Sequence, residues 1–215
     1  MSANDRYHHG DLPSALLEAV GRLIERDGLG AVSLRAAARD VGVSHAAPAH
    51  HFRDKRGMLT AFAARGYEAF SAQMARTWRD SAGAPPAERL RRLTRAYVAF
   101  ASGHRAYYEV MFRPEMVDRL ALAARPATDD AFGVLCAAVA ANLPAGTDRE
   151  QVRELALVAW CNVHGMVQLW FEGPLQHMHK GRSLEALQER SCDVFLSAVA
   201  AGVPPRGDAG SSQAR

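Results

Sequence analysis

The sequence is short of the residues that mark secreted and membrane-spanning proteins. Its 215 residues include only three cysteines, Cys136, Cys161 and Cys192, so we expect no disulfide framework and a reducing, cytoplasmic location. No run of eighteen or more apolar residues is free of charge, which argues against a membrane-spanning helix. The N-terminus is polar and rich in histidine, so we expect no secretory signal there.

Motifs for catalysis and metal binding are also missing. The chain has no glycine-rich phosphate loop, no C-x₂-C pair and no H-x₃-H pair. We therefore predict that it is not an enzyme and that it has no cofactor, no metal and no catalytic residue. Two alternatives stay open: an all-α enzyme that uses His164 as a general base, and a metal-responsive protein that uses its histidines and cysteines. The net charge of +3 permits a nucleic-acid partner but does not establish one.

The chain does have enough apolar material for a core, since 48% of its residues are hydrophobic. Strand patterns are almost absent, and glycine and proline divide the chain into segments of helical length. We predict an all-α fold of four short N-terminal helices and a larger helical bundle. The predicted domains are residues 1–66, residues 67–202 and a disordered tail at 203–215. Predicted helices cover 11–27, 34–40, 44–52, a long segment that Asp54 caps, and segments near 87–102, 104–113, 115–142, 149–173 and 183–201.

The second and third predicted helices form a helix-turn-helix around Gly42. Ser33 is expected to cap the first helix of this pair and Ser44 the second. The second helix would expose His45, Ala46, Ala49 and His50, which are small or polar and have little to bury. Such a face fits the major groove of DNA, although an ordinary helical hairpin with a polar face has the same spacing.

Residues 7–66 resemble the DNA-binding domain of the TetR/AcrR family of bacterial transcriptional regulators. The resemblance rests on YHHGDL at 7–12, SLRAAARDVGV at 33–43, SHAAPAHHF at 44–52 and DKRGML at 54–59. It implies a homeodomain-like three-helix fold, with the recognition helix at 44–51 and with Lys55 opening the fourth helix against a DNA phosphate. Free backbone N–H groups and the helix dipole favour an anion at that position. Ala49 stands where many members carry a tyrosine that contacts the DNA backbone, so we expect that contact to be absent.

Together these arguments give a predicted set of DNA-contacting residues. Arg6 lies in an N-terminal arm, and the basic and imidazole side chains would supply a positive face. The full set is Arg6, Ser33, Arg35, Ser44, His45, Ala46, Ala49, His50, His51 and Lys55.

The last two long helices look suited to pairing with a second copy of the chain. Residues 149–173 are apolar nearly all round, and residues 183–201 carry apolar side chains at coiled-coil-like spacing. We predict a homodimer with a four-helix interface, to which a purely internal core is the alternative. Trp160 followed by His164 and Gly165 resembles the WHG type of C-terminal domain in one branch of the family, and we expect Gly165 to allow close helix approach.

Aromatic residues cluster in the predicted bundle and suggest a pocket for an apolar or aromatic small molecule. The candidate lining residues are Tyr97, Phe100, Tyr107, Tyr108, Met111, Phe112, Phe132, Trp160 and His164. The resemblance implies a ligand-responsive repressor that binds a palindromic double-stranded DNA operator as a homodimer. The operator sequence, the ligand and the regulated genes do not follow from the chain itself.

Overall fold

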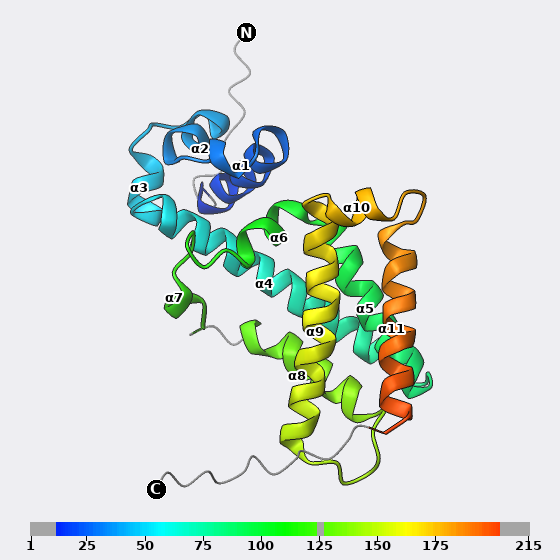
Figure 1. Ribbon diagram of the computed structural model, residues 1–215. Coiled ribbons are helices and arrows are strands. Elements are labelled where there is room, and N and C mark those ends of the chain that lie inside the picture. The colour runs from blue at the N-terminus through cyan, green and yellow to red at the C-terminus, as the bar shows by residue number, and fades with distance from the viewer. Residues whose placement is uncertain (1–11, 124–126, 203–215) are drawn as a thin grey trace, which may run out of the picture. The chain divides into compact units, whose positions relative to one another are not determined.

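The computed structural model describes residues 12–123 and 127–202, and every regular element among them is a helix (Figure 1). The predicted all-α class is therefore confirmed. Arg6 and the predicted tail at 203–215 lie outside the described residues. None of the described helices combines the length and the apolar character that crossing a membrane requires. The chain divides into two compact units, which are described separately below.

The first unit contains residues 1–76 and 99–133. Its core forms where the apolar stripe of α1 packs against α2, α4 and α6, with Leu16, Val20, Met58, Phe62 and Val110 almost fully buried. The helices of this unit are α1 (Leu12–Asp27), the 3₁₀ helix η1 (Leu29–Ala31), α2 (Leu34–Val41), α3 (Ala47–Phe52), most of α4 (Lys55–Asp80), α6 (Arg105–Met111) and α7 (Arg119–Ala123).

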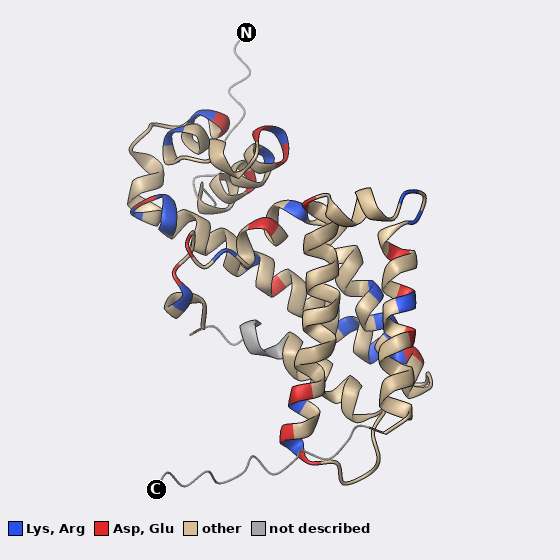
Figure 2. Cartoon of the chain, in the orientation of Figure 1, with Lys and Arg blue, Asp and Glu red and all other residues tan. Residues whose placement is uncertain are grey.

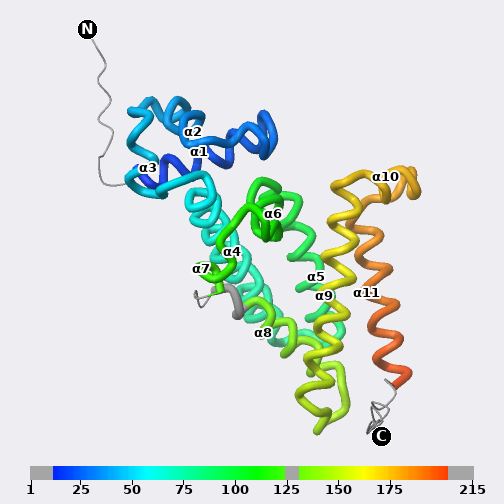
Figure 3. Tube along the Cα trace, turned by 60° about the vertical axis from the view of Figure 1, so that its left-hand side comes forward, coloured from blue at the N-terminus to red at the C-terminus, as the bar shows by residue number. Residues whose placement is uncertain are grey.

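The second unit contains residues 77–98 and 134–215. Its helices are most of α5 (Pro86–Gly103), the second part of α8 (Ala127–Ala140), α9 (Arg149–Phe171), α10 (Pro174–Met178) and α11 (Leu184–Ala200). Helices α9 and α11 lie side by side and are joined through α10 (Figures 1 and 3). The long helices follow the segments predicted near 87–102, 149–173 and 183–201.

Capping side chains fix where several helices begin. Ser33 Oγ accepts a hydrogen bond from the backbone N–H of Ala36 at 3.1 Å, and Asp54 Oδ1 accepts one from Gly57 at 2.7 Å. Each cap satisfies a first-turn N–H that has no partner inside the helix. Both caps were predicted from the sequence and are confirmed.

Other predicted boundaries were wrong. Residues 115–142 do not form one helix, because Asp118 Oδ1 accepts hydrogen bonds from Leu120 and Ala121 at 3.0 and 3.2 Å and so starts α7 later. Helix α10 was not predicted.

The expected close helix approach occurs at a different glycine. A Cβ atom added at Gly165 would meet nothing within 4 Å among the described residues. The prediction that Gly165 lets another helix of the same chain approach closely is therefore wrong. At Gly66, by contrast, a Cβ would lie 2.7 Å from Met111 Sδ and 3.0 Å from Tyr107 Cβ. Gly66 therefore lets α4 approach α6 closely.

Candidate nucleic-acid interface

The turn after α2 is held in a single conformation by backbone hydrogen bonds. Gly42 has φ 78° and ψ 30°, a left-handed conformation that glycine adopts without steric cost. The N–H of Val43 donates to Ala38 O at 3.0 Å, and the N–H of Gly42 donates to Arg39 O at 3.3 Å. This pair of bonds is the Schellman motif, which ends the helix and sets the direction of the chain that follows.

Helix α3 begins at Ala47 rather than at Ser44. The prediction that Ser44 caps this helix is wrong: its backbone oxygen accepts a bond from Ala47 N at 3.1 Å within a turn, and the residue at the cap position is Ala46, which makes no side-chain bond. Pro48 lies in the first helical turn, where its missing N–H costs nothing. Further back, its ring would clash with the carbonyl four residues earlier, so the helix cannot extend to Ser44.

A tight corner joins α3 to α4 without a linker. The N–H of Asp54 donates to Phe52 O at 2.8 Å, and Arg53 between them has φ 65° and ψ −59°, which makes a γ-turn. A Cβ at Gly57 would lie 2.0 Å from Phe52 O, so only glycine fits at this position. The corner fixes Lys55 as the first residue of α4, as predicted.

The described members of the predicted DNA-contacting set all belong to the first unit. Pro48 is buried and Phe52 half-buried on the core side of α3, while the opposite side of the helix faces outward. Lys55 is half-buried, and the other described members are exposed, namely Ser33, Arg35, Ser44, His45, Ala46, Ala49, His50 and His51.

Positive charge lies beside α3 rather than on it. Figure 2 shows Lys and Arg at the start of α4, whereas α3 itself carries none. Arg22 is engaged elsewhere, because its Nη2 lies 2.7 Å from Asp40 Oδ2 in an ion pair between α1 and α2. The cations left for an anionic partner near α3 therefore include Arg35, Arg53 and Lys55.

Three long-range hydrogen bonds tie α4 to the last residue of α6 and to the segment that follows it. Tyr67 OH donates to Met111 O at 2.7 Å, Arg56 Nη2 donates to Val117 O at 2.9 Å, and the N–H of Asp118 donates to Thr60 Oγ1 at 2.9 Å. Burial raises the pKa of the Tyr67 hydroxyl, so it stays protonated as a donor. Sequence reasoning missed these contacts, because they join residues 44 to 61 positions apart and no local pattern marks them.

The candidate ligand-binding residues are divided between the two units. In the first unit, Phe100 and Met111 belong to the hydrophobic core and Tyr107 and Phe112 pack against it. The Phe62 and Tyr107 ring centroids, for example, lie 4.5 Å apart. In the second unit, Tyr97 OH lies 2.8 Å from His164 Nδ1 and the Trp160 ring lies 6.0 Å from that of His164. The first group is Phe100, Tyr107, Tyr108, Met111, Phe112 and Phe132; the second is Tyr97, Trp160 and His164.

His164 is half-buried, and its imidazole is engaged with Tyr97. Burial lowers the pKa of His164 from its ordinary value of 6.5, which favours the neutral ring. Within residues 12–123 and 127–202, no group of three or more His, Cys, Asp or Glu side chains is placed to hold a metal ion.

Helices α9 and α11 expose large apolar side chains in the second unit. Leu157, Val158 and Leu169 on α9 are 40%, 55% and 45% exposed, and Val194 on α11 is 56% exposed. Exposed apolar side chains gathered on two adjacent helices are typical of an interaction surface.

Comparison with known proteins agrees with this architecture. The family model described as "Tetracyclin repressor-like, C-terminal domain" matches residues 90–195. The structure of a protein of unknown function from Rhodococcus sp. RHA1 is 30% identical and covers 91% of this chain and 99% of its own, with a TM-score of 0.73. The TetR family transcriptional regulator PfmR from Thermus thermophilus is 24% identical, covers 85% of this chain and 97% of its own, and has a TM-score of 0.62. No curated protein matches the chain.

A more distant structure shares the fold alone. The fatty acid degradation regulator FadR from Bacillus halodurans is 13% identical over 88% of this chain and 97% of its own, with a TM-score of 0.67. The assignment to the WHG type stays a prediction, since the matching family model is described only as a repressor-like C-terminal domain. From its helix-turn-helix, its C-terminal domain match and its full-length relative, the chain belongs to the TetR family of transcriptional regulators.

Proposed function

We propose that the protein is a ligand-responsive repressor that binds a palindromic DNA operator as a homodimer, and that it is not an enzyme. Residues 1–66 bind DNA, and residues 67–202 bind the ligand and form the dimer. The observation that carries the proposal is the outer face of α3, which is exposed and consists of small and imidazole side chains while Pro48 and Phe52 anchor the helix from behind.

The chemistry of this face suits the major groove. Ala46 and Ala49 let the backbone approach the base edges and contact thymine methyl groups. His45 and His50 supply ring nitrogens that donate or accept hydrogen bonds. Lys55 opens α4, where unpaired N–H groups and the helix dipole already favour a phosphate.

The exposed apolar side chains of α9 and α11 support the dimer. Two copies that pair these helices bury Leu157, Val158 and Val194 in a four-helix interface. A twofold dimer presents two copies of α3 to half-sites about 34 Å apart or a multiple of that.

The response to ligand runs through the contacts between α4 and the segment after α6. A ligand that displaces residues 104–116 pulls on Tyr67 through Met111, and on Arg56 and Thr60 through the two residues that follow this segment. Arg56 and Thr60 lie in the first turns of α4, to which α3 is joined, so these turns tilt. To release DNA, the ligand must prefer the released state by about 3–5 kcal/mol, because populations follow differential affinity.

Fluorescence anisotropy with DNA that flanks the protein's own gene tests the proposal. We expect tight binding to one palindromic segment, with an affinity that falls steeply as salt rises. Lys55→Met should weaken binding to specific and random DNA alike and reduce the salt slope by about one, whereas Lys180→Met, which changes a lysine in the second unit, should change neither.

Base reading is tested by a second variant. His45→Ala should weaken operator binding by about five- to one-hundred-fold and leave random DNA nearly unchanged. Equal losses on both DNAs would contradict base reading by His45. Failure of the unmodified protein to bind any duplex at low salt would overturn the proposed function.

A further inference from the structure

Arg53, at the corner between α3 and α4, has a backbone conformation that suits glycine. Its φ of 65° makes it the one non-glycine residue with positive φ in the part of the chain that the structure describes. At such angles the Cβ of an L-residue crowds the backbone, whereas glycine adopts them without steric cost. The γ-turn at Arg53 is therefore strained by its side chain, and a glycine there would not be.

The fold gives the Arg53 side chain no polar contact that would offset this strain. The side chain is exposed and makes no hydrogen bond or ion pair with another described residue. Only the backbone N–H is used, which donates to Ala49 O at 2.9 Å and which a glycine would also have. A strained residue whose side chain reaches solvent is expected where that side chain acts on a partner outside the chain.

The charge of the Arg53 guanidinium is left unpaired at the end of α3. Asp54, the adjacent acid, does not pair with it, because Asp54 Oδ1 accepts the N–H of Gly57 at 2.7 Å. Arg56 is also engaged, since its Nη2 donates to Val117 O. Helix α3 carries no Lys or Arg of its own, so an anion on its outer face meets cations at this corner (Figure 2).

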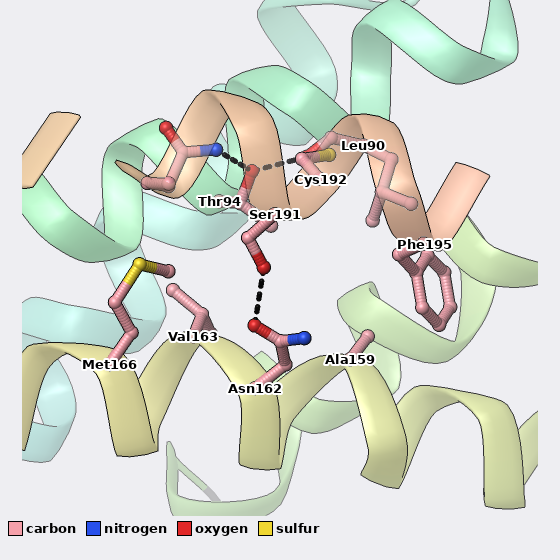
Figure 4. Close-up of a pocket in the computed structure, with 10 residues that line it drawn as sticks. Leu90, Thr94, Ala159, Asn162, Val163, Met166, Ser191, Cys192 and Phe195 are labelled. Carbon is pink, nitrogen blue, oxygen red and sulfur yellow. Dashed lines mark hydrogen bonds between the residues drawn. The ribbon is translucent and has the colours of Figure 1, made fainter. Parts of the chain in front are cut away.

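Helix α5 and the cavity beside it, in the second unit, offer an anion no comparable partner. The cavity between α5, α9 and α11 is lined by uncharged side chains only (Figure 4). The arginines of α5 are all engaged: Arg91 with Asp193, Arg92 with Glu88, Arg95 with Glu189 and Arg89 with Trp78 O. The unpaired cation of the corner therefore contrasts with the paired cations of α5.

We propose that Arg53 binds a phosphate of the DNA backbone next to the bases that α3 reads. The contact presupposes the DNA binding proposed above and lies outside the predicted DNA-contacting set, which includes Lys55 but not Arg53. A guanidinium is planar and donates two parallel N–H bonds to phosphate oxygens. Since phosphates are the same in every sequence, the contact strengthens and positions binding without selecting bases.

Arg53→Gly tests the proposal, because it should make the protein more stable and yet a weaker binder. Glycine relieves the strain, so the thermal midpoint should rise by about 2–4 °C in circular dichroism. Loss of the guanidinium should weaken binding to the operator and to a duplex of random sequence alike, by about tenfold. The salt slope in fluorescence anisotropy should fall by about one.

Three further variants separate charge from backbone. Arg53→Ala removes the charge but keeps the Cβ, so it should lose the same DNA affinity without gaining stability. Arg53→Lys keeps both charge and Cβ and should retain most of the affinity and the salt slope. Arg79→Ala removes an exposed arginine near the end of α4 and should change neither.

Unchanged DNA affinity in Arg53→Ala would overturn the proposal. A loss confined to Arg53→Gly would do the same, because it would trace the effect to a looser corner, and so would a loss confined to the operator, because a phosphate contact is blind to sequence. If the unmodified protein binds no duplex, the proposed function fails and this contact fails with it. Normal binding by the variants would overturn the contact alone.

Discussion

At the scale of single residues, two mid-helix glycines with opposite surroundings give a matched comparison. Gly66→Ala places a methyl group against Met111 and Tyr107, and we expect it to lower the free energy of unfolding by about 1–3 kcal/mol. Gly165→Ala meets open space inside one chain and should raise that free energy by up to about 1 kcal/mol through helix propensity. Urea denaturation of both variants measures the difference.

Gly165→Ala also reports on the proposed dimer. If Gly165→Ala weakens the dimer while the isolated chain stays stable, then the partner subunit comes close to this glycine. A Gly66→Ala variant as stable as the unmodified protein would contradict the tight packing of α4 on α6.

His164 gives a pH-dependent contribution whose sign follows from its lowered pKa. Below the ordinary value of 6.5 the unfolded chain binds a proton at this residue while the folded chain resists it, so stability falls as pH drops from 6.5 toward the folded pKa. Above 6.5 this contribution is constant. We expect His164→Gln to lose less thermal stability between pH 7.5 and 5.5 than the unmodified protein.

The control for this experiment is His177→Gln, which changes an exposed histidine on α10. It should follow the unmodified protein across the pH range. The burial argument for His164 fails if the two glutamine variants have the same pH slope in thermal denaturation.

At the scale of elements, the attachment of α4 to the segment after α6 can be loosened one bond at a time. Thr60→Val removes the acceptor for the Asp118 N–H while keeping the shape of the side chain. A hydrogen bond of this kind contributes about 1 kcal/mol, so the Asp118 amide should exchange with deuterium about fivefold faster. NMR-detected hydrogen exchange measures it, with Thr77→Val, later in the same helix, as the control that should leave this amide unchanged.

Sequence patterns predicted the elements of this fold better than their boundaries. Ser33, Gly42 and Asp54 act within one turn of where they stand in the chain, so their capping and turn roles could be predicted. The start of α3 was predicted wrongly because Ser44 has the residue type of a helix cap. The ring of Pro48 prevents the helix from beginning that early, and only the structure shows this effect.

Local sequence patterns did not predict the tertiary contacts. Which aromatic residues lie in which unit, and which glycine contacts another helix, depend on pairs of residues distant in sequence. The exposed face of α3 was predicted because its residue types are visible locally. The burial of Gln188 on α11 was not predicted, since a buried glutamine in an amphipathic helix has no local mark.

At the scale of the whole molecule, the proposed dimer predicts a change of mass on a single substitution. Val158→Asp puts a charge in the middle of the exposed apolar surface of α9, and we expect about a hundredfold or greater loss of dimer affinity because an unpaired charge would have to be buried. Light scattering after size exclusion should then give the mass of a single chain.

Leu120→Asp is the matched control, since Leu120 is 84% exposed but lies on α7 in the first unit. It should leave the dimer intact. Loss of the dimer in the Leu120 variant alone would assign the interface to a different surface.

The corner between α3 and α4 has a mechanical consequence. Arg53 and Asp54 are the only residues between the two helices, and the Phe52 carbonyl lies against Gly57 with no room for a side chain. Because this joint is so tight, we expect a rotation of the first turn of α4 to move α3, and with it the proposed DNA-binding face. A single extra residue inserted after Arg53 should therefore leave both helices folded but uncouple the orientation of α3 from that of α4.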